Sequence, residues 1–205
     1  MKETFFITGI STDVGKTIAS AILVEALEAD YWKPIQAGEL ENSDTHKVQS
    51  LISNSKSKFH KSAYDLVTPM SPHAAAEIDE VNISSEKITR PKTKNNLIIE
   101  GAGGLLVPLN ESETIIDLIQ LKDKVIVVSR HYLGSINHTL MTLELLKQRN
   151  LNVFGIIFSG DENPYSEAII KKMSGAPILG RIVEEPYFDV NIIKEYAEQF
   201  MDKLR

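Results

Sequence analysis

A glycine-rich segment between an apolar run and an amphipathic run constrains the fold of this chain more than any other feature. Residues 9–17 read Gly-Ile-Ser-Thr-Asp-Val-Gly-Lys-Thr, and a β-branched and aromatic run precedes them at residues 4–8. Residues 15–29 then carry apolar side chains at the three-to-four spacing of a helix. A strand, a glycine-rich turn and a helix in this order predict a phosphate-binding loop.

The residue types in this loop suit a polyphosphate. Small residues let backbone N–H groups turn toward an anion, and the following helix adds the positive end of its dipole. Lys16 can reach the β- and γ-phosphates of a nucleotide, and the Thr17 hydroxyl can ligate Mg²⁺. Five residues separate Gly9 from Gly15, one more than in the general motif. The alternative, that Gly-Lys-Thr only starts a helix, is weaker because a strand precedes it.

The rest of the chain alternates predicted strands and helices. Apolar runs predict strands at residues 31–35, 97–100, 124–129, 153–158 and 177–182. Apolar stripes predict helices at residues 137–149, 165–173 and 189–204. Continuous apolar strands indicate a sheet that is covered on both faces. We therefore expect one α/β domain over residues 1–205, a doubly wound and mainly parallel sheet flanked by helices.

Composition narrows the class of function. The chain has 22 Lys and Arg against 28 Asp and Glu, a net charge of −6 without a long basic run, so we expect neither nucleic acid nor a membrane as partner. The absence of Cys excludes disulfides, zinc–thiolate sites and cysteine nucleophiles, and is typical of a reducing compartment. Without an apolar signal or spanning run, we predict a cytoplasmic protein. The polar and basic residues 84–96 predict a solvated connection.

Two acidic residues could complete a metal site beside the loop. Glu100 ends an apolar run and precedes Gly-Ala-Gly-Gly, which places it at the carboxyl edge of the sheet, where ligands bind. Asp44 could instead cap the helix that runs through Val48. Judged by its own surroundings in the sequence, Asp44 is better interpreted as a helix cap than as a metal ligand. For Glu100, a metal ligand and a structural acid are equally good interpretations.

Six segments, taken in order, together resemble the dethiobiotin synthetase family. They are residues 9–17, Tyr31-Trp32-Lys33-Pro34, Asn42-Ser43-Asp44, Ser71-Pro72-His73, Glu100-Gly-Ala-Gly-Gly and Gly134-Ser135-Ile136-Asn137-His138. The resemblance implies a P-loop NTPase fold and an ATP-dependent ligase of biotin biosynthesis. Such an enzyme carboxylates 7,8-diaminononanoate with CO₂ to a carbamate, phosphorylates the carbamate to a carbamic–phosphoric anhydride, and closes the ring of dethiobiotin.

The resemblance also implies roles for individual residues. Catalytic roles fall on Lys33, Lys16 and Thr12, and the Mg²⁺ ligands are Thr17, Asp44 and Glu100, a hard oxygen set. Contacts to ATP are implied for Asp13, Val14, Gly15, Lys16, Thr17, Ile18, Asp44, Glu100, Gly101, Ala102, Gly103, Ser159 and Gly160. Contacts to the diamine substrate are implied for Thr12, Ala37, Gly134, Ser135 and Asn137. The substrate carboxylate is implied to lie at a helix N-terminus contributed by the second subunit of a homodimer.

Some positions depart from the family. Ala37 stands where the family often has a hydroxyl residue, and residues 183–185 differ from a further base-contacting loop. Ser159 stands where the family commonly has an asparagine that reads the adenine edge. A hydroxyl cannot reproduce the paired donor and acceptor of an amide. We therefore predict loose discrimination between ATP and other triphosphates.

Alternatives stay open at several points. A P-loop ATPase switch of the chromosome-partitioning or septum-placement kind usually carries an extra lysine early in the loop, and residues 9–14 contain none. A related amide-forming ligase or small-molecule kinase is a third possibility. Without the family resemblance, we would interpret Lys33 as a solvated lysine at the end of a strand and Ser135 as a helix cap. His73 and His138 are predicted to be packed or surface histidines without an acid–base role.

Overall fold

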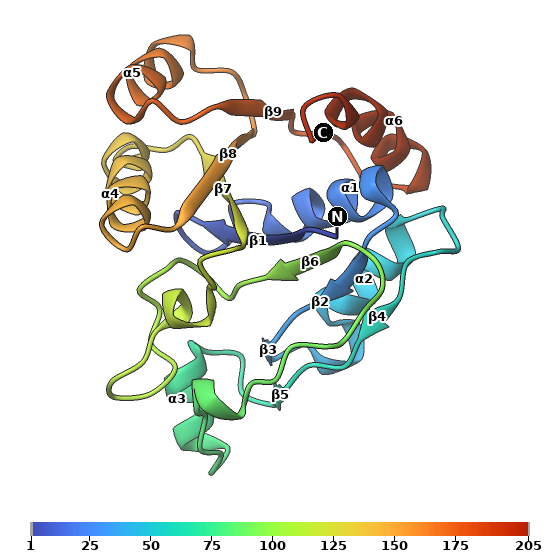
Figure 1. Ribbon diagram of the computed structural model, residues 1–205, viewed down its shortest axis with the longest axis vertical. Coiled ribbons are helices and arrows are strands. Elements are labelled where there is room, and N and C mark those ends of the chain that lie inside the picture. The colour runs from blue at the N-terminus through green and yellow to red at the C-terminus, as the bar shows by residue number, and fades with distance from the viewer. Residues whose placement is uncertain (1, 205) are drawn as a thin grey trace.

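A parallel β-sheet forms the centre of the molecule (Figure 1). The structure is a computed structural model that describes residues 2–204, so Met1 and Arg205, the ends of the predicted domain, lie outside the described residues. Within that span the main sheet has seven strands in the order β4-β2-β6-β1-β7-β8-β9, all parallel. The strands are β1 (Thr4–Gly9), β2 (Asp30–Trp32), β4 (Phe59–His60), β6 (Leu97–Glu100), β7 (Lys124–Arg130), β8 (Asn152–Ser159) and β9 (Ile178–Ile182). The predicted α/β class with a doubly wound parallel sheet is confirmed.

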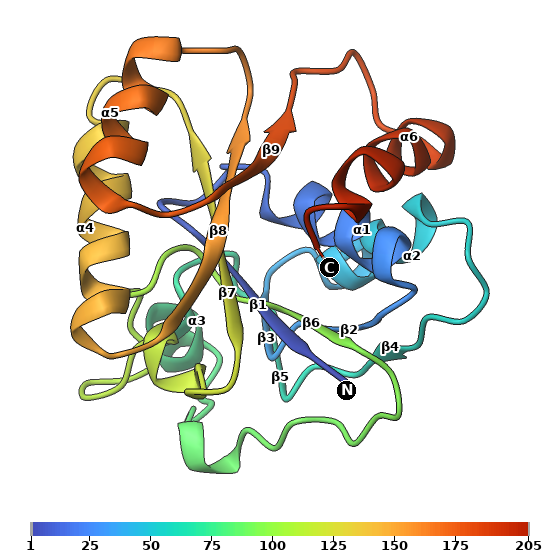
Figure 2. The ribbon, with the colours of Figure 1, turned by 45° about the horizontal axis from the view of Figure 1, so that its top comes forward.

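Helices cover both faces of this sheet. Figure 2 shows α4 and α5 on one side and α1, α2 and α6 on the other, and contacts link α1 to α2 and α6, and α4 to α5. The helices are α1 (Lys16–Leu27), α2 (Asp44–Leu51), α3 (Pro72–Ile78), α4 (Ser135–Gln148), α5 (Pro164–Ser174) and α6 (Val190–Met201), with short 3-10 helices η1 (Leu40–Asn42), η2 (Ser85–Lys87) and η3 (Ile115–Leu118). Among the described residues, no helix has the length and apolar character needed to cross a membrane.

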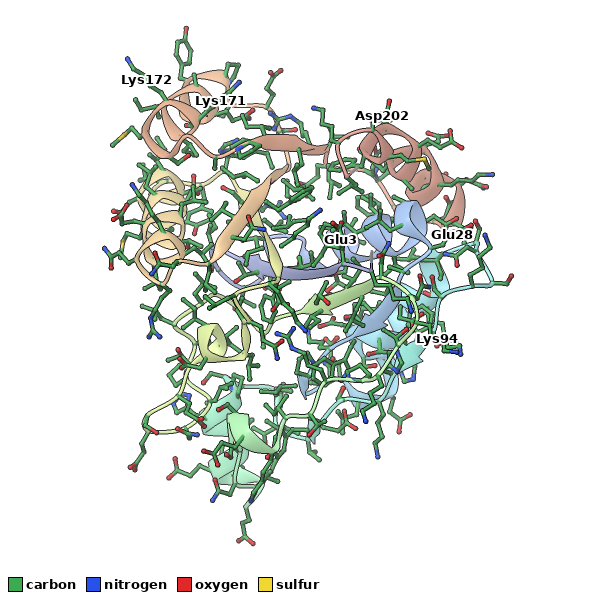
Figure 3. All side chains as sticks on the ribbon, viewed as in Figure 1. Glu3, Glu28, Lys94, Lys171, Lys172 and Asp202 are labelled. Atoms are coloured by element: carbon green, nitrogen blue, oxygen red, sulfur yellow. The ribbon has the colours of Figure 1, made fainter. Side chains whose placement is uncertain are left out.

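The continuous apolar strands form the centre of the hydrophobic core. Phe5, Phe6 and Ile7 of β1 and residues 125–128 of β7 are fully shielded from solvent, because helices pack on both faces of the central strands. On α6 the apolar stripe buries Ile193 and Phe200. Among the charged side chains labelled in Figure 3, Glu28, Lys94, Lys171, Lys172 and Asp202 lie at the rim of the view.

The strand predicted at residues 31–35 is two strands in two different sheets. β2 ends at Trp32, and β3 (Ile35–Ala37) pairs with β5 (Tyr64–Leu66) in a separate two-stranded sheet. Pro34 lies at the break; it has no N–H for the main sheet, and its carbonyl accepts hydrogen bonds from the Ala63 and Tyr64 N–H groups. The chain therefore leaves the sheet at residues 33–34, which frees Lys33 from the strand.

Residues 84–96 are only in part the solvated connection that their composition predicts, since Lys87, Lys92 and Lys94 are exposed but Arg90 and Thr93 are not. Arg90 donates to both carboxylate oxygens of Asp123, at 2.7 and 2.6 Å, and Asp123 is fully buried. Thr93 donates to the buried Asp30 carboxylate at 2.6 Å. Arg90 and Thr93 therefore tie this segment to the amino edge of the sheet.

Candidate functional site

A cleft of about 1120 Å³ opens at the carboxyl ends of the central strands. It brings together most of the residues that the sequence singled out: Thr12, Asp13, Gly15, Lys16, Thr17, Ile18, Lys33, Ala37, Asp44, Glu100, Ala102, Gly103, Ser159 and Gly160. The other predicted site residues, Val14, Gly101, Gly134, Ser135 and Asn137, are not among those that line it. A cleft of this size can hold a nucleotide with a second ligand beside it.

The glycine-rich loop joins β1 to α1 at the middle of this cleft. Gly15 adopts φ 93° and forms the N-cap of α1 without a side-chain cap, which leaves the first N–H groups of the helix available to an anion. A Cβ on Gly9 would lie 2.7 Å from the Ser11 carbonyl oxygen and from Val14 Cγ2, so only glycine fits there. The Val14 side chain is buried beneath the loop, which explains why it does not face the cleft.

Lys16 is the cation of this loop. Its side chain is largely buried, and its ammonium donates to the Ser11 carbonyl at 3.0 Å. Burial lowers the pKa of Lys16, and the carboxylate of Glu100 opposes that effect. The loop thus holds one positive charge at the helix N-terminus, where a phosphate group is also favoured.

Glu100 is the acidic centre of the cleft, and it is almost fully buried at the end of β6. The Thr17 hydroxyl donates to Glu100 Oε1 at 3.0 Å, and the Tyr31 hydroxyl donates to Oε2 at 2.9 Å. Burial raises the pKa of Tyr31 well above its usual value, and the neighbouring Glu100 carboxylate raises it further. Tyr31 therefore stays a neutral donor that fixes the orientation of the Glu100 carboxylate.

Lys33 bridges the two carboxylates of the cleft. Its ammonium lies 3.2 Å from Glu100 Oε1 and is also paired with Asp44 Oδ2. Burial alone would lower the pKa of Lys33, but the charges of Glu100 and Asp44 outweigh it and raise the pKa. The interpretation of Lys33 as a solvated strand-end lysine is therefore wrong: the break at Pro34 turns it into the cleft as a buried cation.

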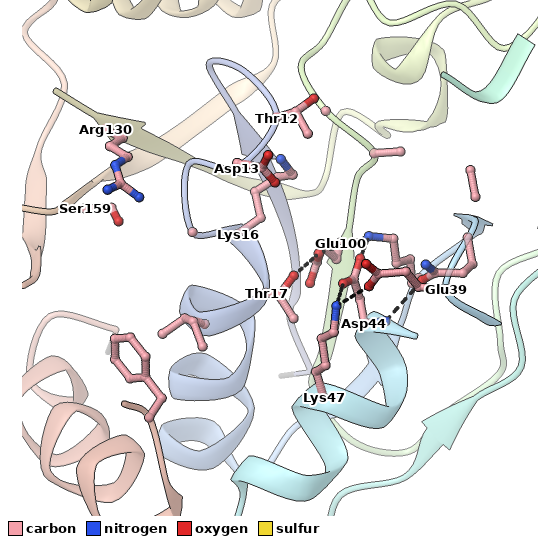
Figure 4. A pocket seen from close by; sticks show the side chains of 18 of the residues that line it. Thr12, Asp13, Lys16, Thr17, Glu39, Asp44, Lys47, Glu100, Arg130 and Ser159 are labelled. Carbon is pink, nitrogen blue, oxygen red and sulfur yellow. Dashed lines mark hydrogen bonds and ion pairs between the residues drawn. The ribbon is translucent and has the colours of Figure 1, made fainter. Parts of the chain in front are cut away.

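Asp44 is the first residue of α2, and it is not the helix cap that the sequence favoured. Ser43 is the cap, since its hydroxyl accepts from the His46 N–H at 3.3 Å. Gln36 holds the start of this helix, because its side-chain carbonyl accepts from the Asp44 N–H at 3.2 Å. The Asp44 carboxylate is thereby free to face Lys33, and Figure 4 shows it pointing toward Glu100 and Thr17.

Oxygen donors converge around Lys33. The described residues hold no cluster of three or more His, Cys, Asp and Glu side chains suited to a metal ion. Thr17 and Glu100 are in direct contact, and Asp44 shares Lys33 with Glu100. One hydroxyl and two carboxylates form the hard oxygen set that Mg²⁺ prefers, with the remaining ligands left for phosphate and water. The side chains present therefore fit that ion.

Sequence reasoning missed several residues of the cleft. Lys47 lies one turn after Asp44 on α2, and its ammonium is 2.5 Å from Glu39 Oε2 and 3.9 Å from Asp44 Oδ1 (Figure 4). Arg130 lies beside Ser159 at the far end of the cleft and pairs with Glu184. The only signal for Lys47 is its three-residue spacing from Asp44 on one helix face, and Arg130 was signalled only by its place at the end of a predicted strand.

The helix N-terminus at residues 134–138 lies outside the cleft of this chain. Gly134 is the N-cap of α4, with φ 104° and no side-chain cap, so the alternative of Ser135 as a helix cap is wrong. Ser135 is buried and Asn137 is exposed. His138 is also exposed and bonds to the Tyr132 hydroxyl, while the exposed His73 bonds to the Ser71 hydroxyl.

Comparisons with solved structures agree with this fold. The septum site-determining protein MinD of Pyrococcus horikoshii, complexed with Mg-ADP, superposes with a TM-score of 0.63 at 15% identity over 99% of this chain and 94% of that one. A ParA family ATPase from Chlorobium tepidum gives a TM-score of 0.58 at 13% identity over 99% and 90%. At these identities the likeness concerns the fold alone.

Sequence comparisons identify the family. The AAA domain family matches residues 3–190. The ATP-dependent dethiobiotin synthetase BioD of Christiangramia forsetii is 62% identical over 204 residues, 100% of this chain and 99% of that protein. The protein of the same name from Cytophaga hutchinsonii is 49% identical over 97% of each chain. With this identity over its full length, and with the glycine-rich loop, Lys33 and the two acids in one cleft, the chain belongs to the ATP-dependent dethiobiotin synthetase family.

Proposed function

We propose that this protein catalyses the ATP-dependent closure of 7,8-diaminononanoate and CO₂ to dethiobiotin. The observation that carries the proposal is the buried ammonium of Lys33 between Asp44 and Glu100, in the same cleft as the phosphate-binding loop. We expect the γ-phosphate to lie next to this fixed cation. The names of the relatives, which specify ATP and dethiobiotin, support the same reaction.

The chemistry explains why the cleft concentrates cations. One amine of the substrate attacks CO₂ and loses a proton to give a carbamate. A carbamate oxygen then attacks the γ-phosphorus while the bond to the ADP oxygen breaks. Both groups are anionic, so catalysis needs positive charge fixed before the reaction begins. We assign Lys16 to the β- and γ-phosphates and Lys33 to the group in transfer. The second amine then attacks the carbamoyl carbon, loses its proton, and expels phosphate as the ring closes.

We further propose that Thr17, Asp44 and Glu100 hold Mg²⁺. When bound, the ion neutralises charge on the phosphate oxygens and helps to orient them. Tyr31 keeps the Glu100 carboxylate oriented through its 2.9 Å hydrogen bond, and Gln36 does the same for Asp44 through the backbone N–H. Thr12 and Ala37 line the same cleft, and we assign them to the diamine.

We propose a homodimer in which residues 134–137 of one subunit complete the site of the other. The N-terminus of α4 has no side-chain cap, and it does not line the cleft of its own chain. The neighbouring Leu133 is fully exposed, as expected for an apolar residue that a second subunit covers. Free N–H groups at this helix end suit the carboxylate of the substrate.

An assay of nucleotide turnover distinguishes this reaction from the ATP hydrolysis of a P-loop ATPase switch of the partitioning or septum-placement kind. ADP release and dethiobiotin formation are measured with ATP and Mg²⁺, with and without diaminononanoate and bicarbonate. We expect ADP release to depend on the diamine and to match product formation one to one. Fast release without the diamine, or release that the diamine does not change, would contradict the proposal.

A further inference from the structure

The end of the cleft beyond the phosphate-binding loop lacks the amide that could read a nucleotide base. Ser159 lies there, but its side chain is directed at the loop: a Cβ on Gly15 would lie 2.8 Å from Ser159 Oγ. The serine is largely buried, and its hydroxyl offers one donor rather than a paired donor and acceptor. The loose discrimination predicted from Ser159 alone therefore holds only if no other side chain at this end reads the base, and Arg130 and Glu184 also line it.

Arg130 and Glu184 supply a donor and an acceptor at this place. Arg130 ends β7 and Glu184 follows β9, and Arg130 Nη2 donates to Glu184 Oε2 at 2.7 Å. Both line the cleft, and their side chains are 43% and 62% exposed. A Cβ on Gly160 would lie 3.8 Å from Glu184 Oε2 and 3.9 Å from Arg130 Cγ. The ion pair thus stands directly over the Ser159-Gly160 turn.

The surrounding contacts fix the backbone that carries the pair. The Tyr196 hydroxyl of α6 donates to Glu185 Oε1 at 2.8 Å and accepts from the Val183 N–H at 3.1 Å. Glu185 is therefore engaged by α6, and its neighbour Glu184 is directed to Arg130. Arg181 donates to the carbonyls of Gly160 and Asp161, at 3.3 and 3.1 Å, and so holds the turn beneath.

We propose that Arg130 and Glu184 together read the base of the nucleotide and select adenine over guanine. This inference rests on the proposed function, because it concerns the nucleotide of that reaction. A guanidinium only donates hydrogen bonds, and a carboxylate only accepts them. Adenine presents its N7 acceptor beside the N6 amino donor, whereas guanine presents two acceptors, N7 and O6, on the same edge. The pair complements the adenine edge, and it sets the Glu184 carboxylate against the guanine O6.

An exposed ion pair of this kind adds little to stability, so the two side chains can be changed without unfolding the protein. The variants are Arg130→Ala, Glu184→Gln, and the exchange Arg130→Glu with Glu184→Arg. The matched controls are Arg149→Ala and Glu28→Gln, which remove members of the exposed pairs Arg149–Asp117 and Glu28–Lys56 away from the cleft.

The assay measures kcat and KM with ATP and with GTP, and the inhibition constant of inorganic triphosphate, a ligand without a base. We expect Arg130→Ala to raise the KM for ATP roughly tenfold with kcat nearly unchanged. We expect Glu184→Gln to lower the ATP-to-GTP ratio of kcat/KM roughly tenfold, since the glutamine amide can donate to O6. The inhibition constant of triphosphate should not change in either variant.

The exchange variant separates base reading from a structural role. It restores an ion pair but reverses the donor and the acceptor, so we expect its preference for ATP to stay lost. Full recovery of the ATP preference would overturn the proposal, as would weaker inhibition by triphosphate in the single variants or equal use of ATP and GTP by the wild type. ATP and GTP affinities measured by calorimetry test the pair even if the wild type forms no dethiobiotin.

Discussion

The two edges of the central sheet both bury charged side chains, and they differ in what surrounds those charges. At the carboxyl edge, Lys33 and Glu100 face a cleft of about 1120 Å³. At the amino edge, Asp123 accepts from Arg90 and from the Gln120 N–H, and the cavity beside Arg90 measures about 140 Å³. That volume is below the roughly 300 Å³ at which ligand pockets begin.

Burial of a charge therefore does not by itself identify a functional site. Asp123 is buried because Arg90 satisfies both of its oxygens and connects residues 84–96 to the sheet. Glu100 is satisfied by three different side chains, and one of them, Lys33, also serves a second carboxylate. The carboxylates at the amino edge are each satisfied without a cation shared between them, whereas at the carboxyl edge Lys33 is shared by two carboxylates that border space for a ligand. We expect substitutions at the two edges to affect different measurements.

The largest effect is expected for Lys16→Ala. The substitution removes the cation that the loop places at the N-terminus of α1, so the developing charge on the phosphates loses its closest fixed partner. We expect dethiobiotin formation to fall by roughly 10³-fold or more, while the midpoint of thermal unfolding stays close to that of the wild type. A variant that keeps more than a tenth of the wild-type kcat would contradict the assignment of Lys16.

Lys33→Ala should come next, with an effect on kcat rather than on nucleotide affinity. We expect kcat to fall by roughly 10²- to 10³-fold, and the ATP dissociation constant, measured by calorimetry, to change only a few-fold. Lys47→Ala is the matched control, since Lys47 contacts the same Asp44 from a more exposed position. An equal loss in both variants would mean that Lys33 acts only through the total charge of the cleft.

Arg90→Ala tests the amino edge. Removing the guanidinium leaves the buried Asp123 carboxylate without its partner, so we expect the free energy of unfolding to drop by roughly 3 kcal/mol. Urea unfolding measures this loss, and kcat for dethiobiotin formation should stay within twofold at temperatures where the variant is folded. A large drop in kcat without a loss of stability would show that this edge takes part in function.

Much of the fold could be predicted from the sequence because its signals are local. The continuous apolar strands and the amphipathic helices identified the α/β class, and the loop at residues 9–17 located the cleft. The break at Pro34 was missed, because an apolar run of this length does not show that its two halves belong to different sheets. Arg90 was misread for a related reason: its partner Asp123 is far away along the chain.

The residues of the candidate site also differ in whether a local sequence signal could reveal them. Lys16 and Thr17 follow from one contiguous motif, and Glu100 was a candidate from its place at the end of an apolar run. Lys33 and Asp44 were assigned to the site only through the family resemblance. Nothing local distinguishes Asp44 from a helix cap; the capping role of Ser43, one residue earlier, becomes visible only with the backbone geometry. Arg130 and Glu184 are 54 residues apart, and only the parallel order of β7, β8 and β9 brings them together.

The smallest effect is expected for Asp30→Asn at the amino edge. The buried Asp30 carboxylate accepts hydrogen bonds from the Thr93 hydroxyl, the Lys58 N–H and His60. Burial alone would raise the pKa of Asp30, but these hydrogen bonds outweigh it and lower the pKa below its usual value near 3.9. The stability that they contribute is therefore present above about pH 4, and it is lost as the pH falls through the lowered pKa.

Asparagine keeps the shape of this side chain but not its charge, so we expect Asp30→Asn to cost about 1–2 kcal/mol at pH 7. The difference from the wild type should begin to shrink below about pH 4, where the carboxyl of the unfolded chain takes up a proton first, and it should fade as the pH passes through the lowered pKa of the folded state. Urea unfolding at pH 7, 5, 4 and 3 measures it, with the exposed Asp65→Asn as control. A difference that stays constant down to pH 3 would mean that the hydrogen bonds lost with one acceptor oxygen, and not the charge, hold Asp30 in place. The amino edge would then lack the paired charge that sets it against the carboxyl edge.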